Sequence, residues 1–260
     1  MDFEYINEGE LNILARNKRL DKFSTLKAID LLKYDGLFMS EFNKLTLHGK
    51  RVISIKEPGS YLLLNYLSQM LNNVSNSKQS DKDLIIRTII QLLQEKTTKF
   101  IYRLDIKKFY ESIHPEIMYN QISQDMRISP NSKKLILLYL NSVESNGFEG
   151  IGRGTSLSGS LAEYFLEDFD KNVKKIEGIY FYARFVDDII IFSFNEILNI
   201  QEKLTSLLPS GLTFHSKSEK FQEIRIDDDK EKKFNYLGYS FEAKKSKLSK
   251  IDISENKVKI

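Results

Sequence analysis

The spacing of apolar residues along the chain alternates between helical and extended patterns. Apolar positions three and four residues apart predict helices, and short runs of β-branched and aromatic residues predict strands. The expected helices lie within 21–47 with a break near Asp35-Gly36, at 61–71, from Asp81 onward, after 106 up to about 118, and at 132–142, 161–173 and 196–208. The expected strands are 50–56, 100–106, 180–185, 189–194, 212–214 and 234–241, while 72–80 and 227–233 are polar connections and the tail from Lys244 is basic and weakly structured. Helices come first and strands then mix with helices, which predicts an α+β fold with a largely antiparallel sheet that helices cover on one face.

The composition narrows the class of protein. Of the 260 residues 41% are hydrophobic, which is enough to build a buried core. The absence of cysteine excludes disulfides, zinc ribbons, iron–sulfur clusters and thiol nucleophiles. No stretch approaches the roughly 18 apolar residues of a membrane span, and the acidic N-terminus lacks a signal-peptide core, so we expect a soluble cytoplasmic protein with no membrane partner. The net charge of +3 permits a polyanionic partner without arguing for one.

Three aspartates stand where ionised carboxylates are costly. Asp105 lies in the apolar run 101–106, and Asp187 and Asp188 separate the two strands of an expected hairpin. A carboxylate among β-branched and aromatic neighbours loses solvation and needs a cation or several hydrogen-bond donors. Mg²⁺ meets that need, since it binds one or two carboxylates and completes its shell with water and phosphate oxygens. Two such ions can bridge the attacking and leaving oxygens of a phosphoryl transfer.

This interpretation sets a geometric condition. Asp105 reaches the hairpin only if its strand is the hairpin's neighbour in the sheet, and Asp188 reaches the site from the turn or lies on its rim, because side chains alternate along a strand. The alternative is that these are ordinary turn aspartates. The aspartates of 227–229 lie among lysines and glutamates, and we expect them to be merely solvated.

Several motifs, taken in order, resemble those of reverse transcriptases. They are LDIKKFYESI from Leu104, the glycine-containing GIGRGTSLSGSLAEYFLEDFD from Gly150, the hairpin FVDD, HSKSEK and YLGYSF. The resemblance is strong from about 103 to 241 and weaker before it. The segments IYRLDIKKFYESI and LAEYFL, and Arg153-Gly154 where other members more often have Gln-Gly, resemble bacterial antiphage enzymes of the defence-associated and abortive-infection groups.

The resemblance implies a right-hand polymerase fold. Residues 1–100 would form a fingers-like region, 101–243 the palm, and 244–260 a basic tail or the start of a missing thumb. Three explanations for the short end stay open: a fragment, a thumb supplied by a protein partner, or an unusually short enzyme. The implied substrates and partners are dNTPs, an RNA template or associated noncoding RNA, and the DNA product.

The resemblance also implies roles for single residues. Asp105 and Asp187, with Asp188 in support and the carbonyl of Ile106, would hold two Mg²⁺ ions, which Mn²⁺ could replace. Lys220 or Lys217 would lie near the leaving pyrophosphate. The three histidines of the chain show no ligand spacing, and we expect them to be structural or superficial.

The remaining roles concern the nucleotide. Tyr110 would lie under the incoming sugar, where its ring collides with a 2′-hydroxyl; otherwise it is a core aromatic. Arg153 and Gly154 would contact template or nucleotide, and Arg51 or Lys50 would bind the triphosphate, with Arg103 and Arg87 as competitors. The serines at 156, 158 and 160 would donate to a nucleic-acid backbone or be small turn residues. Tyr236 to Tyr239 resembles the hairpin that grips a primer end.

Two rival functions share the same motifs. One is an RNA-dependent RNA polymerase, against which the bulky Tyr110 argues. The other is a non-catalytic RNA-binding subunit that kept the palm, against which the presence of all three aspartates argues.

Overall fold

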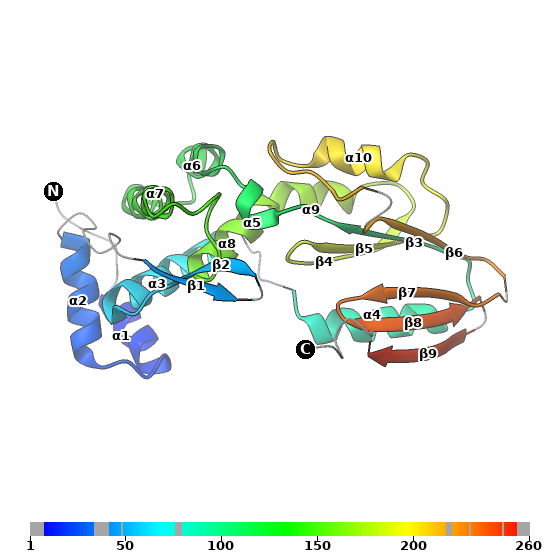
Figure 1. Cartoon of the computed structure of the whole chain (residues 1–260), viewed down its shortest axis with the longest axis horizontal. Helices are drawn as coiled ribbons and strands as arrows, with labels where there is room; N and C mark the ends of the chain where they lie inside the picture. The colour runs from blue at the N-terminus through cyan, green and yellow to red at the C-terminus, as the bar shows by residue number, and fades with distance from the viewer. Residues whose placement is uncertain are drawn as a thin grey trace. The chain divides into compact units, whose positions relative to one another are not determined.

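The computed structural model describes residues 8–33, 42–47, 49–75, 80–216, 220–228, 230–245 and 247–253. The chain divides into two compact units, each built from two segments of sequence. The first, which we call the helical unit, combines Met1–Lys78 with Lys108–Glu167; the second, the sheet unit, combines Gln79–Lys107 with Asp168–Ile260 (Figure 1). Each unit is described by itself. Within the described ranges, no helix is both long and apolar enough to cross a membrane.

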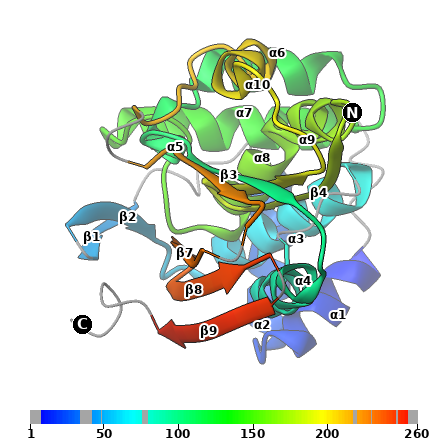
Figure 2. The same cartoon turned by 90° about the vertical axis from the view of Figure 1, so that its right-hand side faces the viewer.

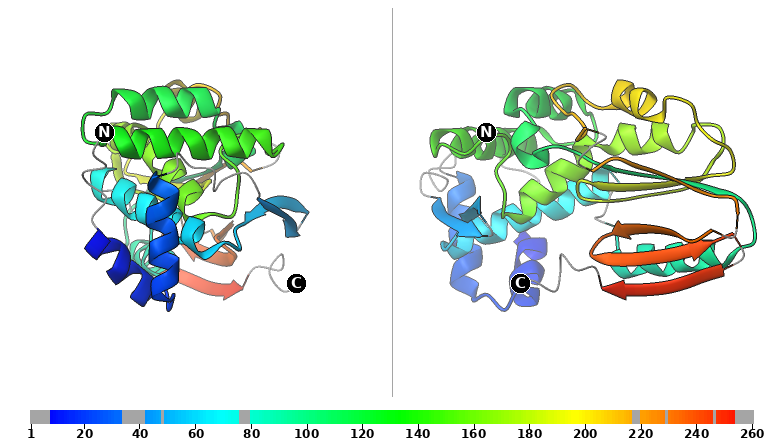
Figure 3. Two further views of the ribbon diagram at one scale, coloured as in Figure 1. Left: turned by 90° about the vertical axis from the view of Figure 1, so that its left-hand side faces the viewer. Right: turned by 45° about the vertical axis from the view of Figure 1, so that its right-hand side comes forward.

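The core of the helical unit is formed by α3 (Pro58–Ser75), which packs against α2 (Lys22–Lys33) and α8 (Ser156–Phe165). Leucines bury one side of α3, and the hydroxyls of Ser68 and Ser160 meet at 2.7 Å between α3 and α8. The antiparallel pair of α6 and α7 stands beside them (Figure 3, left). The other elements are α1 (Glu8–Asn17), β1 (Asn43–Leu47), β2 (Lys50–Ser54), α5 (Phe109–Ser112), α6 (Pro115–Gln124) and α7 (Pro130–Ser145).

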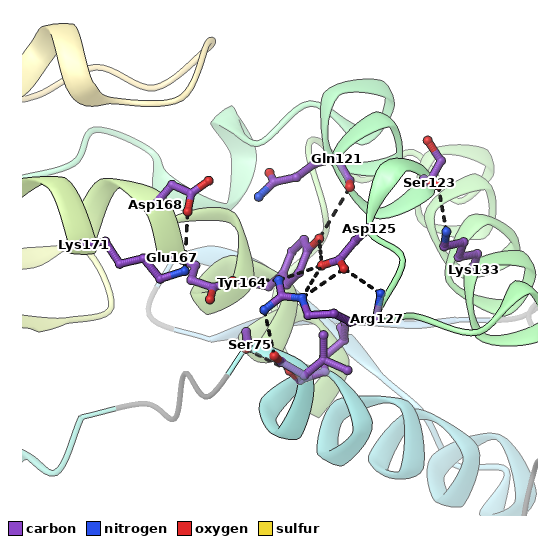
Figure 4. Close-up of polar contacts among 12 residues, drawn as sticks. Ser75, Gln121, Ser123, Asp125, Arg127, Lys133, Tyr164, Glu167, Asp168 and Lys171 are labelled. Atoms are coloured by element: carbon purple, nitrogen blue, oxygen red, sulfur yellow. Dashed lines mark hydrogen bonds and ion pairs between the residues drawn. The ribbon is translucent and has the colours of Figure 1, made fainter.

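A polar network joins three parts of the helical unit. Arg127, between α6 and α7, donates to both carboxylate oxygens of Asp125, to Glu167, and to the Val74 carbonyl at the end of α3. The hydroxyl of Tyr164 on α8 donates to the same Asp125 carboxylate at 2.9 Å (Figure 4). Burial, together with the Asp125 charge, raises the pKa of Tyr164, and the hydrogen bonds from Arg127 hold the pKa of Asp125 well below its usual value. Asp125 therefore stays ionised and ties the α6–α7 connection to α8.

The sheet unit contains a four-stranded antiparallel sheet in the order β4-β5-β3-β6 and a three-stranded sheet in the order β7-β8-β9. One face of the larger sheet packs on α4 and the smaller sheet through a shared apolar core that includes Ile101, Ile190, Phe192, Phe234 and Phe241. On its opposite face lie α9 and α10 (Figures 1 and 2). The bounds are α4 Lys82–Gln94, β3 Lys99–Asp105, α9 Glu167–Val173, β4 Ile179–Phe185, β5 Asp188–Ser193, α10 Ile200–Leu207, β6 Gln222–Ile226, β7 Lys232–Tyr236, β8 Tyr239–Lys244 and β9 Lys247–Ile253.

Most predicted elements are present, and the expected antiparallel sheet is confirmed. Asp81 caps α4 as expected, because its carboxylate accepts from the backbone N–H groups of Asp83 and Leu84. The helix expected up to about 118 is two helices, because Ile113 is extended and Pro115 opens α6. The helix expected at 161–173 begins earlier, at the Thr155 cap, and is interrupted at Leu166.

Some expectations were wrong. The run 234–241 is not one strand, since Leu237 and Gly238 both have positive φ, 48° and 81°, and form the two-residue loop of the β7–β8 hairpin. Residues 43–47 are a strand and not part of a helix, and the tail expected to be weakly structured contains β9. The strand expected at 212–214 is a single bridge from Phe214 to Ile106. The proposed break at 35–36 lies outside the described residues.

Candidate active site

Two of the three aspartates face each other across neighbouring strands. Asp105 ends β3, Asp188 begins β5, and the two are partners in the antiparallel register. Directly opposed residues point to the same face of a sheet, so both carboxylates lie on one face. Asp105 is only 4% exposed. The geometric condition set by the sequence is therefore met, since β3 is the neighbour of the hairpin strand β5.

Asp187 lies in the two-residue bend between β4 and β5. Its carbonyl accepts from the amide of Ile106 at 3.0 Å, which places the bend beside the end of β3. The preceding Val186 has a φ of 59°, an unusual conformation for a β-branched residue. Such strain persists only where surrounding contacts hold it.

Arg184 supplies those contacts from β4. Its buried guanidinium donates to the Val186 carbonyl at 2.9 Å and to both carboxylate oxygens of Asp170 on α9, at 3.0 and 2.7 Å. The hydroxyl of Tyr182, two residues earlier on the same strand face, also donates to Asp170. The ion pair between Arg184 and Asp170 therefore ties the bend that carries Asp187 to α9.

Two side chains from the segment that precedes β6, those of Lys220 and His215, contact the Asp105 carboxylate. Lys220 Nζ lies 2.8 Å from each carboxylate oxygen, and His215 Nε2 lies 3.2 Å from Oδ1. The backbone amide of His215 also donates to the Asp105 carbonyl at 3.0 Å. The expectation that all three histidines are structural or superficial misses this contact with the site. Of the two lysines weighed from the sequence, Lys220 reaches the carboxylate, whereas Lys217 lies outside the described residues.

Among the described residues, nearby cations neutralise the charge of Asp188 less completely than that of Asp105. Arg103 Nη2 lies 3.5 Å from its carboxylate, and Tyr236, from β7, donates its hydroxyl to the Asp188 carbonyl at 3.1 Å. Burial raises the pKa of Asp188 to about 6; Arg103 opposes this shift, and the negative charges of Asp105 and Asp187 add to it. Arg103, weighed from the sequence as a triphosphate ligand, is instead directed at Asp188.

The donor set fits a divalent cation. The three aspartates supply the carboxylate oxygens that hard ions prefer, and burial raises the pKa of Asp188 while the charges of Asp105 and Asp187 add to that shift. Within the described residues, no three acidic or histidine side chains are already grouped as a metal site. A cation that binds Asp105 would therefore have to displace or share the Lys220 contact.

Most of the other residues singled out from the sequence lie in the helical unit, whereas Arg87, on α4, and Tyr236 to Tyr239, in the β7–β8 hairpin, belong to the sheet unit. Tyr110 and Glu111 are on α5, next to the loop of residues 150–154 that carries Arg153. Lys50 and Arg51 are exposed on β2. Gly154 lies against β2, where a Cβ would come 2.6 Å from the Ile53 carbonyl oxygen.

Two of the three serines weighed as nucleic-acid donors are buried. Ser158 bonds with Tyr139 and Thr155, and Ser160 bonds with Ser68. These contacts favour the structural role for both serines.

Comparisons with known proteins identify the fold and the family. The family described as reverse transcriptase (RNA-dependent DNA polymerase) matches residues 43–241. Among solved structures, an apo telomerase from Candida tropicalis truncated from its C-terminal domain has a TM-score of 0.56 at 13% identity, over 83% of this chain and 55% of that one. The untruncated apo telomerase from Candida tropicalis has the same TM-score and identity, over 81% and 48%. Telomerase from Candida albicans with a fragment of telomeric RNA has a TM-score of 0.52 at 13% identity, over 84% and 46%.

Likeness at this identity shows a shared fold, and the chain spans about half the length of these telomerases. No curated protein matches it significantly. The family match covers most of the chain, including Asp105, the bend at 186–188 and Lys220. The chain belongs to the reverse transcriptase family.

Proposed function

We propose that the protein is an RNA-directed DNA polymerase that adds dNTPs to a 3′-hydroxyl. The observation that carries the proposal is the pairing of Asp105 with Asp188 beside the Asp187 bend, in a chain of the reverse transcriptase family. Such a site works mostly by positioning and by stabilising negative charge, since phosphoryl transfer spreads charge over several oxygens.

Asp105, Asp187 and Asp188, together with the carbonyl of Ile106, would hold two Mg²⁺ ions, with Mn²⁺ as a substitute. When bound, such ions stabilise the attacking and leaving oxygens of a nucleotidyl transfer. Lys220 would neutralise charge on the departing pyrophosphate or give it a proton. His215 would keep Asp105 oriented through its two contacts with that residue.

The nucleotide would be recognised by residues of the helical unit. Tyr110 would exclude a 2′-hydroxyl, and Arg51 and Lys50 would bind the triphosphate. Gly154 would permit close approach of template or nucleotide to the backbone. Arg153, which lies beside Tyr110, would be part of the same nucleotide site.

The test is incorporation of labelled dNTPs on a primed RNA template with Mg²⁺. Asp187→Asn should fold normally and lose nearly all incorporation, because it removes a metal ligand while keeping the side chain's size. Asp168→Asn is the matched control, since Asp168 is an exposed aspartate of the same unit that pairs with Lys171 at 3.6 Å. Wild-type incorporation by Asp187→Asn would reject the site.

Parallel reactions separate the rival functions. Incorporation of NTPs in preference to dNTPs would favour an RNA polymerase. A wild-type protein that binds RNA but shows no metal-dependent incorporation would favour a non-catalytic subunit.

We further propose a role in bacterial antiphage defence. Support comes from the resemblance of IYRLDIKKFYESI, Arg153-Gly154 and LAEYFL to that group of enzymes. Plaque counts on bacteria that express the protein should fall relative to cells with Asp187→Asn, and sequencing of co-purified nucleic acid should identify an associated RNA. Equal plaque counts across a broad phage panel would reject the role.

A further inference from the structure

The loop of residues 150–154 is held between two elements of the helical unit. At one end, a Cβ on Gly150 would come within 2.0 Å of the Tyr110 carbonyl oxygen, and the amide of Ile151 donates to that same carbonyl at 3.2 Å. At the other end, the amide of Ile53 on β2 donates to the Arg153 carbonyl at 2.6 Å. The backbone of Arg153 is thereby fixed next to α5.

The side chain of Arg153 makes two interactions with adjacent residues of α5. Its Nε and Nη2 each lie 3.1 Å from a different carboxylate oxygen of Glu111, which is the fork geometry of a strong arginine–carboxylate pair. Its Cζ lies 4.7 Å from the ring centroid of Tyr110, within the range of a cation–π contact. Both Arg153 and Glu111 are mostly buried, with side chains 21% and 25% exposed.

The charge on Glu111 secures this arrangement. Burial acts to raise the pKa of Glu111, but the hydrogen bonds from Arg153 and the charges of Arg153 and Lys50 lower it on balance. The carboxylate therefore stays ionised near neutral pH and holds the guanidinium in place beside the ring.

We propose that Arg153 is a positioning residue that fixes the Tyr110 ring and thereby sets discrimination between deoxyribonucleotides and ribonucleotides. The proposal rests on the proposed function of Tyr110. A ring excludes a 2′-hydroxyl only if it cannot swing aside, and a guanidinium held near its ring by Glu111 limits that movement. A glutamine side chain at position 153 would have neither the positive charge nor the two N–H groups that bind both carboxylate oxygens of Glu111.

The experiment measures kcat/KM for one dNTP and for the corresponding ribonucleotide on the same primed RNA template. Tyr110→Ala gives the change in the ratio of dNTP to ribonucleotide efficiency that follows from complete loss of the ring. Arg153→Gln should lower the ratio of dNTP to ribonucleotide efficiency about tenfold, mainly by improving use of the ribonucleotide. Arg153→Lys should give an intermediate ratio, since it keeps the charge but loses the two-fold contact with Glu111. Glu111→Gln should shift the ratio in the same direction as Arg153→Gln.

Arg127→Gln is the matched control for loss of a bonded arginine in the same unit. It removes the contacts to Asp125 and should lower the melting temperature without changing the nucleotide ratio. An unchanged ratio in Arg153→Gln, while Tyr110→Ala changes it, would overturn the inference. Equal losses for both nucleotides would also overturn it, because they would indicate direct contact with phosphate or template. No incorporation by the unaltered protein would instead reject the proposed function, and this inference with it.

Discussion

Asp105 shows how a nearly buried carboxylate is stabilised by one short segment of chain. His215 and Lys220 lie five residues apart, and both reach its carboxylate, at 3.2 Å and 2.8 Å. The Lys220 side chain is 44% exposed while Asp105 is almost covered, so the ammonium contacts the carboxylate from the solvent side. The contact holds the ammonium beside Asp105, close to the place where product charge would develop in the proposed reaction.

Lys220→Gln should lower kcat for nucleotide incorporation by about 10²-fold and change KM little, because a positioned ammonium acts on developing charge. Single-turnover rates would measure the chemical step directly. Lys171→Gln, on the exposed face of α9, is the control and should leave the rate unchanged. If the two variants behave alike, Lys220 has no part in the chemistry.

At this scale, the sequence was informative where a motif carries chemistry. The three aspartates and Lys220 were predicted because each lies in a short motif with a distinctive neighbourhood. His215, Arg184 and Asp170 were not predicted, since their roles depend on contacts between different elements that no local pattern reports. Only the shared strand face of Tyr182 and Arg184, two residues apart, could have suggested that they act together.

At the scale of elements, the network around Asp125 shows how a polar cluster joins helices of the helical unit. The Asp125 carboxylate accepts from Arg127 in its own connection after α6 and from Tyr164 on α8, and Arg127 extends the network to the end of α3 (Figure 4). Because the pKa of Asp125 is lowered in the folded protein, its contribution to stability is complete at neutral pH. That contribution should decline as the pH falls below the ordinary carboxyl pKa of about 4.

Asp125→Asn should therefore reduce the free energy of unfolding at pH 7 by about 1–2 kcal/mol, a modest value because the Arg127 side chain is half exposed to solvent. Thermal melts at several pH values would measure it. The difference from wild type should shrink toward acidic pH, and Asp168→Asn should show no comparable effect. A difference independent of pH would show that the charge of Asp125 is not what stabilises the network.

Element predictions succeeded where periodicity was strong and failed where local backbone geometry decided the outcome. The strands β3, β4 and β5 follow β-branched and aromatic runs and were expected within about one residue. The break in 234–241 was missed because the run is apolar throughout, and only the positive φ at Leu237 and Gly238 separates the two strands. Pro115 gave a signal for the end of the preceding helix that the apolar spacing obscured.

At the scale of the molecule, each unit draws on two distant stretches of sequence. The helical unit needs α3, which packs on α8, and the sheet unit needs α4, whose Ile85, Ile89 and Leu93 enter the core under the large sheet. Both α3 and α4 precede residue 100. Hydrophobic patterning gives no direct sign of this interleaving, because it reports local elements and not their partners. The division at residues 100 and 243 stays a prediction drawn from the resemblance.

A protein limited to residues 101–243 should not fold cooperatively, since it lacks α3 from one unit and α4 and β9 from the other. Circular dichroism melts and binding of a hydrophobic dye would show a broad transition and exposed apolar surface. A version that begins before α1 and ends after β9 should melt sharply. A sharp melt of the shorter protein would show that the two-segment units are not needed for folding.

The pairing of Asp105 with Lys220, and of Asp188 with Arg103, has a consequence for the order of assembly. The chain supplies its own counter-charges to the carboxylates, so it can reach its native shape before any divalent ion arrives. In the proposed site, binding of divalent ions would then be a late, reversible replacement of Lys220 and Arg103 as partners of the carboxylates in a protein that is already folded. Removal of Mg²⁺ should therefore abolish nucleotide incorporation without unfolding the protein.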